Sequence, residues 1–271
     1  MGKINFPLLK IKIYQPQAHY RIPFTYQRRH TYPIPPYSTV LGLIANVLGI
    51  KNLPGQEEPC LKENCNCIYH KFKKLKISIC GNFKDKSTEY TWLRNLSKEA
   101  HEKRFICSKN RYVAGHIEHI GGQAPCLIDI LNDVNIIIYL YHEDYNFLET
   151  IKESFNNPNN RTSPLHLGRA EDWIIIKEID ILKTFIIEEI NGDYKNFFWI
   201  PEKTFDLGYN FDFNKINGLV YNLTTFYKIV NGSRNFEYIR VKLNDGNLGD
   251  IYSLYDPNED IPIFLGDLGG K

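Results

Sequence analysis

The residues best suited to chemistry lie in one short segment, His19 to Tyr32, in which basic and aromatic side chains alternate. Arginine donates paired hydrogen bonds to phosphate and stacks on bases, while tyrosine and histidine offer flat stacking faces. The segment leads into a predicted helix whose first N–H groups, from Ser38 to Leu41, can hold a phosphate. We therefore assign a polyanion-binding role to these residues: Arg21, Arg28, Arg29, His30, Tyr32, Ser38 and Thr39.

The alternative is that the aromatic side chains of this segment pack the loop onto the core. Phe24, Tyr26 and Tyr32 are the residues concerned, and we expect burial of about half of them, since large aromatic side chains are usually inside. A second basic and aromatic series lies between residues 81 and 125, and three of its bases are also assigned to binding: Arg104, Lys109 and Arg111.

Catalytic signatures are few. The sequence has no phosphate-binding loop, no dinucleotide glycine fingerprint and no nucleophile elbow. His116 and His119 are three residues apart, whereas a zinc-hydrolase helix needs ligands four apart on one face. With His101, they are the histidines available as a general base at a ribose 2′-OH. We predict no catalytic residue and no cofactor.

Cys60, Cys65, Cys67 and His70 offer four possible zinc ligands within eleven residues. Their donor atoms suit zinc, but the spacing matches no common finger or ribbon, so we predict no metal and favour ordinary loop cysteines, with a structural zinc as the alternative. Six cysteines at uneven spacing do not form a secreted disulfide scaffold. Without a signal peptide or an apolar run near the ~18 residues that cross a bilayer, the sequence predicts a cytoplasmic protein that does not contact membranes.

The charge is distributed unequally along the chain. Residues 1–112 carry 20 Lys and Arg against 7 Asp and Glu, a balance of +13, and residues 113–271 carry 13 against 24, a balance of −11. The two sum to the net +2 of the whole chain, and the first acidic residue is Glu57. Such asymmetry favours a polyanion contact made by the first half over a solvated basic surface.

Hydrophobic periodicity predicts the elements that position these residues. Strands are expected at 3–14, 71–80, 134–141 and 173–179, and helices after a cap at Ser38 or Thr39 and over 144–155. Two strand–helix–strand units in this order indicate a ferredoxin-like (RRM-like) α+β domain. We predict this domain over residues 1–190, with a protruding arm at 81–125 and a β-rich C-terminal subdomain at 191–271.

Two motifs resemble those of CRISPR-associated protein family five, a RAMP family. Residues 32–49 (YPIPPYSTVLGLIANVLG) are similar to its N-terminal motif, and residues 164–173 (PLHLGRAEDW) to its second signature. Within the second motif, Arg169 is expected either to contact RNA or to brace its turn through Glu171 or Asp172. The length and the second motif resemble members from type I-B systems most.

The resemblance implies a subunit that caps one end of the Cascade surveillance complex and holds the 5′ handle of the CRISPR RNA. It implies that the arm, as a thumb, reaches the backbone subunit of family seven. The large subunit, of family eight, would dock beside it and read the target DNA, which this chain would meet only indirectly.

Two alternatives for the function of the chain stay open. One is a metal-independent endoribonuclease that processes CRISPR RNA, and the other is a purely protein-bridging subunit.

Overall fold

The computed structural model describes residues 2–25, 27–52, 55–62, 65–95, 112–113, 116–117, 122–204 and 211–269. In these residues strands predominate over helices, so the predicted mixed α and β class is confirmed. The helices there are α1 (Tyr37–Val47), α2 (Ile68–Lys73), α4 (Tyr145–Asn156) and the short η2 (Pro158–Asn160) and η3 (Phe213–Lys215). None of the helices in the described part has the length and apolar character to span a bilayer.

The strands of the described part fall into an N-terminal and a C-terminal group. The first group is β1 (Gly2–Ala18), β2 (Tyr20–Arg21), β3 (Arg28–Arg29), β4 (Thr31–Tyr32), β5 (Lys76–Asn82), β6 (Asp85–Asn95), β7 (Tyr112–Val113), β8 (His116–Ile117) and β9 (Gly122–Tyr141). The second group is β10 (Ile175–Asp193), β11 (Phe197–Pro201), β12 (Leu219–Val230), β13 (Ser233–Asn244), β14 (Asn247–Asp256), β15 (Ile261–Ile263) and β16 (Gly266–Asp267).

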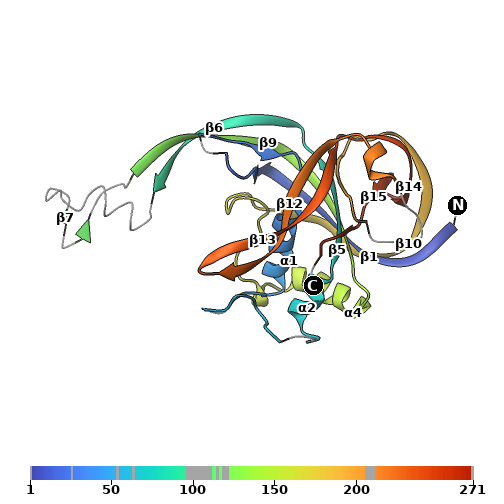
Figure 1. Cartoon of the computed structure of the whole chain (residues 1–271), viewed down its shortest axis with the longest axis horizontal. Coiled ribbons are helices and arrows are strands. Elements are labelled where there is room, and N and C mark those ends of the chain that lie inside the picture. The colour runs from blue at the N-terminus through green and yellow to red at the C-terminus, as the bar shows by residue number, and fades with distance from the viewer. Residues whose placement is uncertain are drawn as a thin grey trace.

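Four strands form the middle of the main sheet in the spatial order β5-β9-β1-β10, and each neighbouring pair is antiparallel. Helices α1 and α4 lie on the same side of this sheet (Figure 1). Leu9, Ile11 and Ile13 of β1 face them and share one core with the apolar sides of both helices. On the opposite face of β1, the buried Lys10 pairs with Glu178 at 2.6 Å and Glu259 at 2.8 Å.

The C-terminal strands extend both edges of this sheet. β11, β13 and β12 follow β5 on one side, and β14 and β15 follow β10 on the other. A second core between Phe6, Leu8, Tyr139 and the C-terminal strands includes Phe198 and Leu254. The predicted boundary at residue 190 falls near the end of β10, so the segment after it shares a sheet with the segment before it.

Strand β6 and the first half of β9 pair from Asp85↔Asn132 to Asn95↔Gly122 and project from the body of the molecule (Figure 1). This ladder forms the base of the arm predicted at 81–125. Beyond it only β7 and β8 are described, and Arg104, Lys109, Arg111, His101 and His119 lie outside the described residues.

Two local predictions were wrong. The segment predicted as a strand at 71–80 begins as helix α2, and β5 starts at Lys76. Helical spacing places Tyr69 and Phe72 together on the core, where Phe72 meets Phe226 edge to edge at 5.7 Å. The cap of α1 is Pro36 rather than Ser38 or Thr39, since its carbonyl already accepts from the N–H groups of Thr39 and Val40.

Candidate nucleic-acid interface

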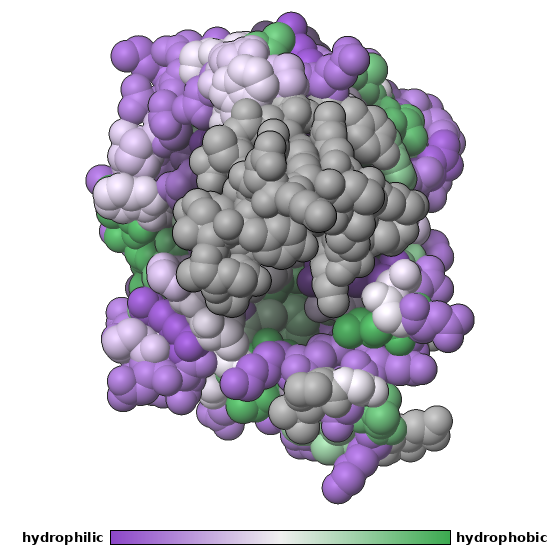
Figure 2. Space-filling view, turned by 90° about the vertical axis from the view of Figure 1, so that its left-hand side faces the viewer, coloured by the Kyte–Doolittle hydropathy of each residue, from purple (hydrophilic) through white to green (hydrophobic). Residues whose placement is uncertain are grey.

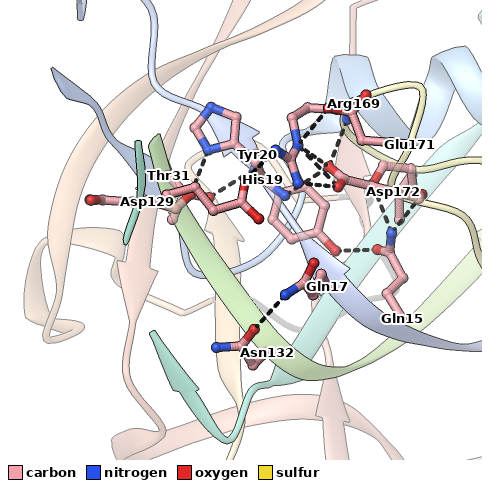
Figure 3. A network of polar contacts seen from close by, with 12 residues as sticks. Gln15, Gln17, His19, Tyr20, Thr31, Asp129, Asn132, Arg169, Glu171 and Asp172 are labelled. Carbon is pink, nitrogen blue, oxygen red and sulfur yellow. Dashed lines mark hydrogen bonds and ion pairs between the residues drawn. The ribbon is translucent and has the colours of Figure 1, made fainter. Parts of the chain in front are cut away.

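The buried carboxylate of Asp172 is the centre of a polar network that joins the loop before β10 to the end of β1 (Figure 3). Its Oδ2 accepts hydrogen bonds from the backbone N–H groups of His19 at 2.9 Å and of Arg169 at 2.8 Å. The guanidinium of Arg169 donates to the same carboxylate from Nη2 at 2.7 Å and from Nε at 3.1 Å. These donors offset the cost of burying a charged group.

Arg169 also connects this loop to the arm, because its Nη1 donates to Oε2 of Glu89 on β6 at 3.2 Å. Only 18% of the Arg169 side chain is exposed. Burial lowers the pKa of Arg169, but the carboxylates of Asp172 and Glu89 raise it by more, so the guanidinium stays charged. In this geometry Arg169 braces the turn, and its main partner is Asp172, one of the two carboxylates that the sequence analysis named.

Gln15 and Gly168 fix the position of the loop. Gln15 donates from Nε2 to the carbonyls of Leu167 at 2.9 Å and Asp172 at 3.0 Å, and accepts from the hydroxyl of Tyr20 at 2.5 Å. Gly168 has φ +111°, and a Cβ atom there would lie 2.8 Å from Oδ2 of Asp172 and 2.9 Å from the His19 carbonyl. Only glycine allows this close approach of loop and strand end.

Both family-like motifs line one cleft of about 320 Å³. Asn46 of α1 holds the facing loop, since its Oδ1 accepts from the N–H groups of Thr162 and Ser163, both at 2.9 Å. Gly42 forms part of the wall, and nothing lies within 4 Å of the position its Cβ would take. The lining residues are Thr39, Gly42, Leu43, Asn46, Thr162, Ser163, His166 and Gly168.

Three basic side chains surround the buried carboxylate of Asp129 on β9. Arg28 lies 3.0 Å from it, His30 also 3.0 Å and Lys86 3.6 Å, while each of the three side chains is 48% exposed. Burial raises the pKa of Asp129, but its hydrogen bonds with His30 and Arg28 outweigh this effect and lower it. We call Arg28, His30 and Lys86 the basic ridge. The positive charge of the basic ridge is larger than the negative charge of the one carboxylate, that of Asp129, that positions it.

The structure brings some of the sequence-predicted binding residues together and separates others. Arg21 is exposed and donates to the Thr25 carbonyl at 3.1 Å. Arg29 is half-buried beside Arg28, and its Nε has no hydrogen-bond partner among the described residues. Thr39 is half-buried on the cleft wall. Figure 2 views the molecule from the side on which the arm projects, and the coloured surface there is mainly hydrophilic, with smaller hydrophobic patches.

Two predicted contacts do not fit their observed positions. Tyr32 is 6% exposed and packs edge-on against Trp199 and Tyr221, both at 5.6 Å, so its ring has no free face for a base. Ser38 is half-buried, and its hydroxyl accepts a hydrogen bond from Thr224 on β12 at 2.8 Å. In both cases packing against the C-terminal strands uses the group that was expected to meet a ligand.

The predicted binding residues do not include other exposed side chains of this surface. Phe24, which could equally have been core, is 86% exposed beside the basic loop residues. Lys86 lies on the same face of β6 as the exposed Tyr90 and Trp92, whose rings meet edge-on with centroids 6.0 Å apart. A two-residue period of basic and aromatic side chains was the available signal for this strand face. The role of Asp129 depends on pairing across the sheet, which sequence spacing does not reveal.

The four side chains that the sequence analysis considered as zinc ligands also lie close together. None of them belongs to the network of Asp172 or to the basic ridge. The ligand atoms of Cys60, Cys65, Cys67 and His70 all lie within 4.8 Å of one another. Burial raises the pKa of Cys67, but hydrogen bonds with His70, Cys65 and Cys60 outweigh it and lower this pKa to about 6.

Structural comparison finds a solved structure of similar fold. One solved structure, a chain described as "CRISPR RNA-guided surveillance complex", is similar with a TM-score of 0.54 and 10% sequence identity, over 90% of this chain and 91% of that chain. A second, described as "Crystal structure of Cas protein", has a TM-score of 0.41 and 14% identity, over 96% and 99% of the two chains. The first similarity shows a shared fold.

A family model matches the N-terminal part of the sequence. Residues 8–104 match the model of the family described as CRISPR-associated protein (Cas_Cas5), which confirms the predicted family in this part of the chain. The match includes the motif at 32–49, the basic ridge and the start of the arm. No curated protein gives a significant match. The finer assignment to type I-B stays a prediction.

Replacing Arg169 by alanine should destabilise the protein, because Asp172 keeps only its two backbone donors and Glu89 loses its partner. We expect the free energy of unfolding to fall by about 3 kcal/mol, as when one member of a buried ion pair is removed. Arg169→Lys should recover only part, since an ammonium lacks the guanidinium fork. The measurement is urea unfolding followed by tryptophan fluorescence. Arg240→Ala, which breaks an exposed pair with Glu202, should cost less than about 1 kcal/mol, and equal effects of both variants would contradict the bracing role.

Proposed function

We propose that this chain is a non-catalytic subunit of a type I Cascade surveillance complex and that it binds the 5′ handle of the CRISPR RNA. The observation that carries the proposal is the basic ridge, three exposed basic side chains held in place by one buried carboxylate at the base of the arm. Positive side chains fixed in this way attract a phosphate backbone and need little ordering when it binds.

The exposed face of β6 beyond the ridge favours RNA over a compact anion as the ligand. Tyr90 is 61% exposed and Trp92 55% exposed, and both follow Lys86 along the same face of β6. Alternate residues of a strand project on one side and are roughly 6.6 Å apart. Exposed aromatic rings beside a basic groove stack on unpaired bases without selecting one sequence. Phe24, exposed at the tip of the preceding loop, is a third such ring.

The chain order of the central elements supports a ferredoxin-like RAMP unit. It runs β1-α1-β5-β9-α4-β10, with α2 added before β5, and the spatial order is β5-β9-β1-β10. A β-α-β-β-α-β chain with two helices on one face of an antiparallel sheet is the ferredoxin-like arrangement. In this proposal the cleft between α1 and the 162–168 loop lies where the two family-like motifs meet.

We also propose that the chain contacts neighbouring protein subunits, with the arm directed towards the family-seven backbone subunit and the body towards the family-eight large subunit. Trp173 is 70% exposed and Ile175, on the same side of the strand that follows, is 44% exposed. We take these two neighbouring apolar side chains as the candidate contact with another subunit. Target DNA would be met only through the large subunit, and such a complex would act in the cytoplasm.

The described histidines favour binding over RNA cleavage. His19 and His142 are buried, and burial lowers the pKa of each, so both are neutral. His30 is engaged by Asp129, and His70 lies against Cys67. His166 lines the cleft, where its Nδ1 lies 2.9 Å from the Pro164 carbonyl. General acid–base cleavage needs two groups held in line about one phosphate, and no such pair occurs among these five imidazoles.

Removing two cations of the basic ridge should weaken RNA binding and reduce its dependence on salt. For Arg28→Gln with Lys86→Gln, we expect handle RNA to bind about tenfold more weakly near 0.1 M salt. The slope of log affinity against log salt should become shallower by roughly 1.4, because each neutralised phosphate of a single strand contributes about 0.7. Fluorescence anisotropy across a salt series measures both quantities.

The matched control is Arg240→Gln with Lys228→Gln. These side chains are 50% and 49% exposed, close to the 48% of the ridge residues, and each lies in an ion pair. They belong to β13 and β12, outside the proposed interface. The control should leave the slope unchanged. If both pairs of substitutions reduce it equally, binding follows total charge and the ridge is not the site.

Purified protein should leave precursor CRISPR RNA intact over hours at neutral pH, with or without divalent metal. The assay is denaturing gel electrophoresis of end-labelled RNA containing one repeat. Specific cutting within the repeat that is lost on replacing His101, His116, His119 or His166 by alanine would make the chain a processing endoribonuclease and would contradict the proposal.

A further inference from the structure

A loop and the start of helix α2 gather three cysteines and one histidine at one point. Cys67 is the N-cap residue of α2, and His70 is three residues further on, so both side chains lie on the same side of its first turn. Sγ of Cys67 is 3.1 Å from Nδ1 of His70. Cys60 and Cys65 approach from the preceding loop, and all four ligand atoms lie within 4.8 Å of one another.

The donor set selects a soft, tetrahedral metal ion. Three thiolates and one imidazole are a common set for structural zinc, with Zn–S near 2.3 Å and Zn–N near 2.1 Å, which places two ligating sulfurs about 3.8 Å apart. The four side chains are half-buried, and Cys60, Cys65 and Cys67 are free thiols rather than disulfides. Calcium and magnesium prefer oxygen ligands, which this cluster does not contain.

Glu58, two residues before Cys60, is already engaged. It accepts from the hydroxyl of Tyr69 at 3.1 Å and from Lys73 at 3.3 Å, and it lies 3.8 Å from Lys228 of β12. The carbonyl of the neighbouring Glu57 accepts from the N–H of Ile229 at 3.1 Å. Residues 57 and 58 of the loop therefore contact strand β12. The cysteine cluster begins two residues after this contact.

We propose that Cys60, Cys65, Cys67 and His70 form a structural zinc site that fixes this loop against α2 and thereby the contact of Glu57 and Glu58 with β12. One ion bound by all four side chains would join the loop of Cys60 and Cys65 to the first turn of α2, a helix of only six residues. This revises the sequence-based prediction of no metal, which considered spacing and not the three-dimensional approach of the loop.

The test is the metal content of the full-length chain, produced without a polyhistidine tag in medium supplemented with zinc and purified without chelators. Plasma mass spectrometry should find about one zinc ion per chain. Cys65→Ser with Cys67→Ser should reduce this at least tenfold, and serine at position 67 retains a good N-cap so that α2 can still form. Cys126→Ser, a thiol removed outside the cluster, should keep the metal.

A second measurement does not depend on the variants folding. Cobalt added to the metal-depleted wild-type chain should give the visible absorption bands of tetrahedral thiolate coordination, with saturation at one equivalent, and zinc should displace them. Chelation should lower the melting temperature of the wild type by several degrees and leave that of the double variant unchanged. Wild-type protein that contains no zinc and gives no cobalt bands would overturn the proposal, whatever the outcome of RNA-binding experiments.

Discussion

The arrangement of the candidate interface depends on the burial of one carboxylate, that of Asp172. Its oxygens accept from two backbone N–H groups and from a guanidinium, and these donors come from the end of β1 and from the loop before β10. The same guanidinium reaches Glu89 on β6. One charged group thus fixes three parts of the chain relative to each other: the strand that leads into the basic loop, the second motif and the base of the arm.

The basic ridge uses the same principle on the neighbouring strand. Asp129 is almost fully buried, and the backbone carbonyl of this residue also contacts Nδ1 of the buried His19, whose N–H is held by Asp172. His19 therefore links the carboxylate of Asp172 to the backbone of Asp129. Because each carboxylate is inside and its cations lie towards the surface, the structure presents positive charge without leaving an unpaired charge in the core. This separation is what a binding surface for a polyanion requires.

Much of the architecture follows from local patterns in the sequence. The alternation at Leu9, Ile11 and Ile13 and the helical spacing in α1 and α4 predicted the central elements, and the charge imbalance indicated the basic half. The failures came from tertiary contacts: Phe72 packs on Phe226 and turns a predicted strand into helix α2, and Tyr32 is covered by Trp199 and Tyr221. The position of Asp129 depends on pairing between separate strands, which spacing along the chain does not encode, whereas the cysteine cluster was visible in the sequence but its convergence was not.

The most direct test of the account is to map where RNA contacts the protein. Handle RNA carrying photoreactive uridines would be crosslinked to the full-length chain, and the linked peptides identified by mass spectrometry. The account predicts crosslinks in residues 19–32 and 84–95, which include Phe24, the basic ridge residues Arg28, His30 and Lys86, and the exposed Tyr90 and Trp92. Crosslinks confined to β12–β15, with none in these two segments, would contradict it.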